Sequence, residues 1–152
     1  MAEPAPAYLL DTNVLLRLYK PSSPESPLIH HAIRSLRRAN ASLWYVPQNI
    51  VEFWNVSTRP VARNGYGLSV AETENMAREI ETAFILLPEV EAVHREWRRL
   101  VLAYGVAGAK VHDARIVAAM IIHHVSNILT LDQTGFSRYA EVVAVHPQEL
   151  QG

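Results

Sequence analysis

Apolar residues follow two alternating patterns along the chain: short continuous runs, and longer stretches in which they recur every three or four positions. The runs predict strands at residues 8–10, 43–46, 84–87, 127–131 and 142–145. The longer stretches predict helices that begin near Thr12, Leu28, Pro47, Ser69, Val90 and Lys110. Regular alternation of strand and helix favours an α/β fold: a three-layer α/β/α sandwich around a mainly parallel sheet of about five strands, with 142–145 at an edge.

Segments rich in proline and glycine interrupt this pattern. Residues 1–7 (MAEPAPA) are expected to form a mobile lead, and residues 21–27 (PSSPESP) to end the first helix. Residues 59–68 (RPVARNGYGL) form the clearest loop, which would serve equally as a mobile flap, a partner contact or a plain connection. Nothing indicates a second domain or a repeat, so residues 1–152 are expected to form a single domain.

Composition narrows the class of protein. With 152 residues and 49% hydrophobic residues, the chain is long enough to bury a substantial core. Its 14 basic and 15 acidic residues leave a net charge of −1, so a polyanion would have to be held by local arginines and a metal ion. The absence of cysteine excludes disulfides, thiolate metal sites and cysteine nucleophiles. With neither a membrane-length apolar run nor a signal-peptide pattern, we expect a cytoplasmic protein.

Aspartate occurs at only three positions, and each lies next to the start or the end of a predicted strand or helix. Asp11 and Asp132 directly follow predicted strands, and Asp113 lies in the first turns of a predicted helix. A fourth acid, Glu52, stands inside the apolar run NIVEFWNV, where a carboxylate is costly unless it is paired or holds a cation. Functional crevices of parallel sheets lie at the carboxyl ends of the strands, so we expect these acids to gather there.

Four clustered carboxylates without histidine or cysteine partners would repel one another strongly. They are compatible with a hard cation such as Mg²⁺ or Mn²⁺, which prefers oxygen ligands. Such ions polarise phosphoryl oxygens and lower the pKa of water, which points to hydrolysis of phosphodiester bonds. A phosphotransferase of the DxD type would need a second acid at position 13, which is Asn13, and a receiver domain would need paired acids after the first strand. The remaining alternative is a non-catalytic partner-binding scaffold, which would have no reason to tolerate the repulsion.

Basic residues near Asp113 leave their roles open. Lys110 and Arg115 flank it and would either hold a scissile phosphate or only offset the local negative charge. His112 adjoins Asp113 but points a different way on a helix, so a structural role is favoured over that of a general base.

Four segments, in chain order LLDTNVLL, NIVEFWNV, VHDARIVAAM and ILTLDQTGFSRY, resemble the acidic motifs of PIN-domain ribonucleases, particularly VapC-type toxins of prokaryotic toxin–antitoxin systems. The resemblance extends from Tyr8 to about Pro147. It implies a PIN-like fold and a Mg²⁺- or Mn²⁺-dependent endoribonuclease. In that family's pattern Asp11 and Asp113 match the principal metal ligands, Glu52 an acid that binds directly or through water, and Asp132 the fourth acidic position.

The resemblance also implies roles for hydroxyl residues and partners. Thr12 and Thr130 match hydroxyl positions of the site. Gly135 stands where many members carry a further acid, so one Mg²⁺, with another arriving with substrate, is expected. The family further implies an RNA substrate, a small antitoxin protein that covers the acidic cleft, and a homodimer. The sequence of the RNA, and whether the chain is a toxin or a housekeeping nuclease, stay open.

Overall fold

The computed structural model describes residues 4–150, and its elements follow the predicted order. The strands are β1 (Ala7–Leu10), β2 (Ser42–Tyr45), β3 (Ile85–Leu86), β4 (Asn127–Leu129) and β5 (Val143–Val145). The helices are α1 (Thr12–Leu18), α2 (Ser26–Arg38), α3 (Pro47–Thr58), α4 (Val70–Ala83), α5 (Glu91–Ala103) and α6 (Lys110–Ile122). Short 3₁₀ turns are η1 (Val61–Arg63), η2 (Gln133–Gly135) and η3 (Pro147–Leu150).

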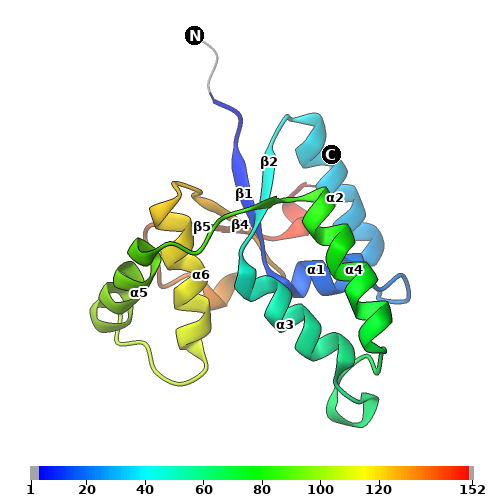
Figure 1. Ribbon diagram of the computed structural model, residues 1–152. Helices are drawn as coiled ribbons and strands as arrows, with labels where there is room; N and C mark the ends of the chain where they lie inside the picture. The colour runs from blue at the N-terminus through cyan, green and yellow to red at the C-terminus, as the bar shows by residue number, and fades with distance from the viewer. Residues whose placement is uncertain (1–3, 151–152) are drawn as a thin grey trace.

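The sheet contains five parallel strands in the order β3-β2-β1-β4-β5, which confirms the predicted α/β class. β1 lies at the centre, paired with β2 on one side and β4 on the other (Figure 1). β5 forms one edge, as predicted. The chain therefore places the strand that precedes Asp11 between two strands that lead to other parts of the candidate site.

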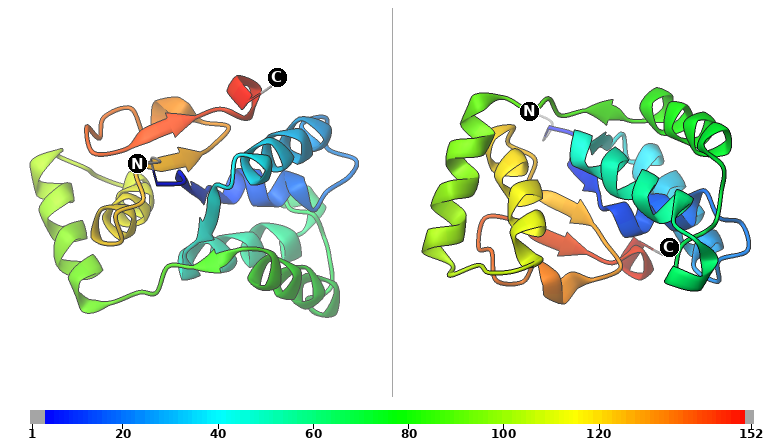
Figure 2. Two further views of the ribbon diagram at one scale, coloured as in Figure 1. Left: turned by 90° about the horizontal axis from the view of Figure 1, so that it is seen from above. Right: turned by 60° about the horizontal axis from the view of Figure 1, so that its bottom comes forward.

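Consecutive residues of β1 pack into different cores, because side chains of a strand alternate between the two faces. Leu9 packs with residues of α5 and α6, whereas Leu10 packs with residues of α1, α2, α3 and α4. Both leucines are fully buried. The sheet thus lies between two helical layers, which are seen from above in the left view of Figure 2.

The carboxyl ends of the strands and several helix starts lie at one end of the molecule. α1 begins directly after β1 and α3 after β2, and α6 runs back along the sheet, so that its first turn reaches the same end (Figure 1). The right view of Figure 2 brings this end forward. Residues from both helical layers can therefore meet there.

Boundaries differ from the predictions at several points. Ala7 already pairs with Ser42 in β1, so the predicted lead is shorter, and residues 1–3 of it lie outside the described residues. β3 and β4 are shorter than the apolar runs that predicted them, because pairing stops before the runs end. The helix predicted from Leu28 begins at Ser26, since Pro27 suits a first turn.

The loop at 59–68 is tied back onto α3. Backbone N–H groups of Tyr66 and Leu68 donate to the carbonyls of Val56 and Ser57 at 2.9 and 2.8 Å. The Lys20 ammonium lies 4.0 Å from the centre of the Tyr66 ring. Of the roles left open for this loop, these contacts favour a plain packed connection.

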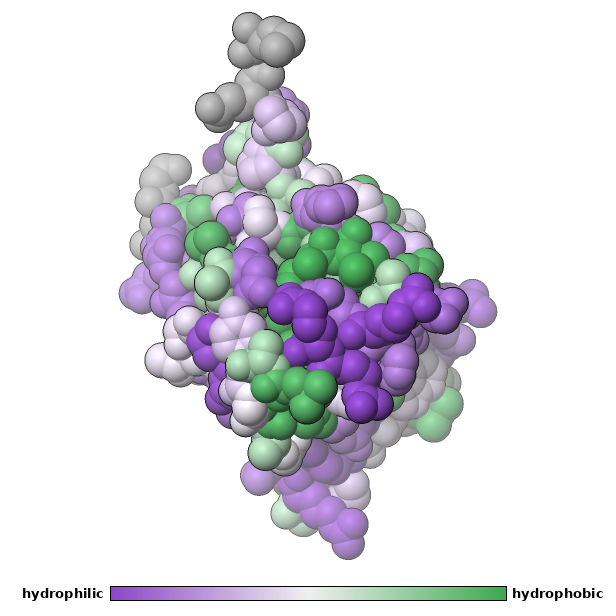
Figure 3. All heavy atoms as spheres, turned by 90° about the vertical axis from the view of Figure 1, so that its left-hand side faces the viewer, coloured by the Kyte–Doolittle hydropathy of each residue, from purple (hydrophilic) through white to green (hydrophobic). Residues whose placement is uncertain are grey.

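The outer face of α5 is charged. Arg95 and Glu91 form an exposed ion pair of 2.9 Å. Figure 3, which views the molecule from the α5 side, shows hydrophilic atoms across the middle of this face, with separate hydrophobic areas above and below. Within residues 4–150, no helix has the length and apolar character needed to cross a membrane.

Candidate active site

Asp11 joins the end of β1 to the start of α1. It caps α1, with its Oδ1 accepting from the Thr12 backbone N–H at 2.8 Å. Its Oδ2 accepts from the Thr130 hydroxyl, also at 2.8 Å. Only 8% of the residue is exposed. Burial raises the pKa of Asp11 to about 6, the charges of Asp113 and Glu52 push it in the same direction, and the two hydrogen bonds oppose them.

Thr12 links the first helix to Glu52 on α3. Its hydroxyl donates to Glu52 Oε1 at 2.8 Å and accepts from the side-chain amide of Asn49 at 3.0 Å. Asn49 is fully buried, and its Oδ1 accepts from the Val46 backbone N–H at 2.8 Å. The amide thereby fixes the start of α3 and the orientation of the threonine together.

Thr130 is the corresponding link on the other side of Asp11. Besides donating to Asp11, its oxygen accepts from the Asp132 backbone N–H at 3.0 Å and from Asn13 Nδ2 at 3.3 Å. Asn13 Oδ1 in turn accepts from the Leu131 backbone N–H at 3.2 Å. These bonds attach the segment after β4 to the first turn of α1.

Asp113 comes from the opposite helical layer, in the first turn of α6. Burial raises its pKa, the nearby Lys110 charge lowers it, and Glu52 and Asp132 raise it. Asp113 therefore lies within electrostatic reach of acids from α3 and from the end of β4. Asp11, Glu52, Asp113 and Asp132 share one region, as the sequence predicts.

Asp132 begins the turn η2. Its Oδ1 accepts from the Thr134 hydroxyl at 2.8 Å and from the Gly135 backbone N–H at 3.3 Å. A Cβ atom at position 135 would lie 2.9 Å from Asp132 Oδ2 and 3.6 Å from Asp113 Oδ2. A side chain at this position would therefore have to displace the carboxylate of Asp132, which gives a steric reason for the glycine.

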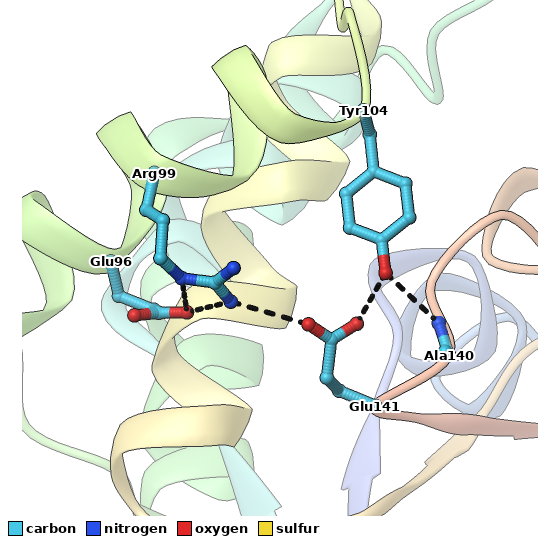
Figure 4. Close-up of polar contacts among 5 residues, drawn as sticks. All are labelled: Glu96, Arg99, Tyr104, Ala140 and Glu141. Atoms are coloured by element: carbon cyan, nitrogen blue, oxygen red, sulfur yellow. Dashed lines mark hydrogen bonds and ion pairs between the residues drawn. The ribbon is translucent and has the colours of Figure 1, made fainter.

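A polar network fixes the segment that follows Asp132 (Figure 4). The Tyr104 hydroxyl donates to Glu141 Oε1 at 2.7 Å, and the Ala140 backbone N–H donates to the same hydroxyl at 3.3 Å. Arg99 pairs with Glu141 at 3.2 Å and also with Glu96. The hydrogen bond from Tyr104 is the main reason that the pKa of Glu141 is lowered. The network joins this segment to α5.

A cleft of about 670 Å³ lies beside Glu52, between α3 and α6. Its lining residues are Pro47, Gln48, Val51, Glu52, Asn55, Glu89, His112 and Arg115. Gln48 spans the two helices by donating from its amide to the His112 carbonyl at 2.9 Å. Of the four acids, Glu52 thus faces this groove, beside polar side chains of α3 and α6.

The carboxylate oxygens of the four acids are ligands of the kind that a hard divalent cation prefers, but their positions in this structure do not surround a single ion. Among residues 4–150, no group of three or more His, Asp or Glu side chains is placed to hold one ion. All four acids nevertheless offer oxygen ligands, and the charges of neighbouring carboxylates add to burial in raising the pKa of Asp11 and Asp113. Side-chain rearrangement would have to bring the carboxylates together around a cation.

Sequence reasoning missed the two asparagines that organise this region. From the sequence, Asn13 is interpreted only as a possible helix start and as the residue that replaces a second acid, and Asn49 only as part of an apolar helix. One signal was available for Asn49: it stands three residues after Val46, where a polar side chain can cap the start of α3. No comparable signal marks Asn13, whose partners lie more than a hundred residues away along the chain.

Several solved structures of known proteins are similar to this chain. Solved structures similar to this chain include VapBC2 from Rickettsia felis bound to a promoter DNA fragment (TM-score 0.67, 12% identity, covering 92% of this chain and 98% of that one). FitAcB from Neisseria gonorrhoeae gives a TM-score of 0.61 at 21% identity, with 93% and 98% coverage. VapC20 from Mycobacterium tuberculosis, a sarcin–ricin loop cleaving toxin, gives 0.61 at 15% identity, with 89% and 98% coverage.

At these identities the structural matches show a shared fold. No curated protein matches the sequence significantly. The model of the PIN domain family, however, matches residues 8–142, which include all four acidic motifs. The chain therefore belongs to the PIN domain family.

Proposed function

We propose that this protein is a Mg²⁺- or Mn²⁺-dependent endoribonuclease that hydrolyses RNA phosphodiester bonds. The observation that carries the proposal is the position of Asp11, Glu52, Asp113 and Asp132, which reach the same end of a PIN-domain sheet from both helical layers. Asp11 and Asp113 would be the principal ligands of the cation, with Glu52 and Asp132 completing the site. When bound, the cation would polarise the phosphoryl group, lower the pKa of the attacking water and stabilise the leaving oxygen.

The protein's own contribution is orientation. Thr130 holds one oxygen of Asp11 and the Thr12 N–H holds the other, so the carboxylate has a fixed direction. The hydroxyl of Thr12 holds Glu52 in the same way. Thr12 and Thr130 therefore act as positioning residues, and the buried Asn49 positions Thr12.

We further propose that the chain is the toxin of a toxin–antitoxin pair and acts in the cytoplasm. One similar structure is a toxin–antitoxin complex from Klebsiella pneumoniae, and another, VapC20, is a toxin that cleaves the sarcin–ricin loop. On this basis the partners would be a small antitoxin that covers the acidic cleft and a second copy of the chain. A small reading frame immediately upstream of the gene would support this proposal, and co-expression of its product should yield a complex in which cleavage is suppressed.

Cleavage of an RNA pool by purified protein tests the enzymatic proposal. Activity should require Mg²⁺ or Mn²⁺, stop in EDTA and be lost in Asp113→Asn, which keeps the shape of the side chain. Glu91→Gln removes the same charge from the exposed outer face of α5, outside the cleft lining, and should retain full activity. Activity that persists in Asp113→Asn would refute the assignment.

A second candidate, a non-catalytic partner-binding scaffold, is favoured by one observation. Within residues 4–150, the acids are not placed to share an ion without rearrangement. A well-folded protein that neither cleaves RNA nor gains thermal stability from either metal would establish the scaffold instead.

A further inference from the structure

The cleft beside Glu52 is lined by polar side chains that the proposed cation site does not use. Its volume, about 670 Å³, lies within the range of roughly 300–1,000 Å³ typical of ligand pockets. The side chains of Gln48, Asn55 and His112 offer hydrogen bonds, and Arg115 is the one guanidinium in its lining. This combination suits a nucleotide, because amides and imidazoles bind base edges while arginine binds phosphate.

Arg115 lies close to the acidic cluster. It shares the cleft with Glu52, one of the four acids, although its side chain leaves α6 on a different side from Asp113, two residues earlier. A phosphate bound to its guanidinium would therefore lie next to the scissile phosphate, which the acids would position. In a single-stranded nucleic acid, neighbouring phosphates belong to consecutive nucleotides.

The Arg115 guanidinium is already paired with the carboxylate of Glu89, which comes from the segment between β3 and α5. The two side chains are 36% and 45% exposed, so water reaches both. Exposed ion pairs contribute little net stability, which makes exchange of one anionic partner for another inexpensive. Glu89 thus occupies the guanidinium of Arg115, to which a substrate phosphate would have to bind.

We propose that Arg115 is a substrate-positioning residue, which exchanges Glu89 for a phosphate of single-stranded RNA next to the scissile one. Glu89 then weakens substrate binding by competing for the guanidinium. This inference rests on the proposed ribonuclease function and identifies the part of the cleft that holds the flanking nucleotide.

Binding measured without hydrolysis tests the inference. The probe is a fluorescein-labelled ten-residue oligouridylate, followed by anisotropy in EDTA over a series of salt concentrations. Arg115→Gln should weaken binding roughly tenfold, and loss of one phosphate contact should reduce the slope of log K against log salt by about 0.7. Arg115→Lys keeps the charge and should retain most of the affinity, whereas an effect caused by misfolding would appear in both variants.

The Glu89→Gln variant tests the competition. It should bind the probe roughly three- to tenfold more tightly, and this gain should vanish when Arg115→Gln is also present. Glu91→Gln and Arg95→Gln remove the same charges from an ion pair outside the cleft and should change affinity little. They control for the effect of net charge.

Three outcomes would overturn the inference: no binding of the probe by the parent protein, equal losses in Arg115→Gln and Arg95→Gln, or a gain in Glu89→Gln that persists without Arg115. Failure of the nuclease proposal is separately visible. If the binding pattern is as expected but no metal supports cleavage, the cleft binds RNA and the hydrolytic assignment fails. If cleavage is metal-dependent and unaffected by Arg115→Gln, only the present inference fails.

Discussion

At the scale of single residues, Asp11 is the place where stability and the proposed chemistry conflict. Its folded pKa of about 6 lies above the ordinary 3.8, mainly because the carboxylate is buried. Protonation of Asp11 therefore favours the folded state. This contribution is complete below about pH 3.8 and is lost as the pH rises through about 6, so the ionised residue destabilises the metal-free protein at neutral pH.

Asp11→Asn should accordingly stabilise the protein in EDTA at pH 8. The difference between about 6 and 3.8 corresponds to roughly 3 kcal/mol in the free energy of unfolding, and the gain should disappear near pH 4. Urea denaturation from pH 4 to pH 8 measures it. Asp132→Asn leaves the burial of Asp11 unchanged, so it should keep most of the parent's pH dependence and lose only the smaller part that Asp132 adds by raising the pKa of Asp113. An Asp11→Asn variant less stable than the parent at pH 8 would contradict the prediction.

Thr130 gives a second prediction, because its hydroxyl lowers the pKa of Asp11. Thr130→Val keeps the shape but leaves Asp11, Asn13 and the Asp132 N–H without this partner, so it should lower the free energy of unfolding at pH 8 by about 1–3 kcal/mol. The Asp11 pKa should rise further, moving the loss of stability to higher pH. Thr130→Ser retains the hydroxyl and should behave nearly as the parent in the same denaturation series.

At the scale of elements, the connection from α3 to α4 depends on one glycine for space. A Cβ atom at Gly65 would lie 1.9 Å from the carbonyl oxygen of Arg59, so Gly65→Ala must displace the backbone of the loop. We expect it to lower the free energy of unfolding by at least about 2 kcal/mol. At Gly105, where φ is +60° and no atom lies within 4 Å of the added Cβ, alanine should cost only about 1 kcal/mol. Thermal denaturation of the two variants compares the cost of a steric clash, at position 65, with the cost of a positive φ angle, at position 105.

The sequence predicts elements well and their connections less well, for a physical reason. Periodic apolar positions report which side of an element is buried, so the five strands, the six helices and the edge position of β5 could be predicted. The end of each strand depends on where its neighbour stops pairing, which is why β3 and β4 are shorter than their apolar runs. The constraint at Gly65 depends on a tertiary fold of the loop and left no local signal.

The candidate site shows the same division. Asp11, Asp113 and Asp132 stand at predicted element ends, and Glu52 stands out in an apolar run, so their meeting could be predicted from topology alone. The partners that orient them could not, because Asn13 and Asn49 act through contacts between distant segments. The pairing of Arg115 with Glu89 likewise depends on where the segment before α5 crosses α6.

At the scale of the whole molecule, the acids connect two separately packed layers. Asp11 and Glu52 belong to α1 and α3, which pack with one core, whereas Asp113 belongs to α6, which packs with the other. A cation held by all of them would bridge the layers at the end of the sheet. Its binding should therefore stabilise the molecule as a whole, and not only the turn that carries each ligand.

Melting and hydrogen exchange with Mn²⁺ or EDTA test this bridging. Mn²⁺ at 100 times its dissociation constant should add about 2.7 kcal/mol to the free energy of unfolding, and should slow amide exchange at the first turns of both α3 and α6. Asp113→Asn should remove the protection of α3 as well as that of α6, because the cation loses its attachment to one layer. If this variant loses protection only in α6, the cation is bound by Asp11 and Glu52 without bridging, and Asp113 is not one of its principal ligands.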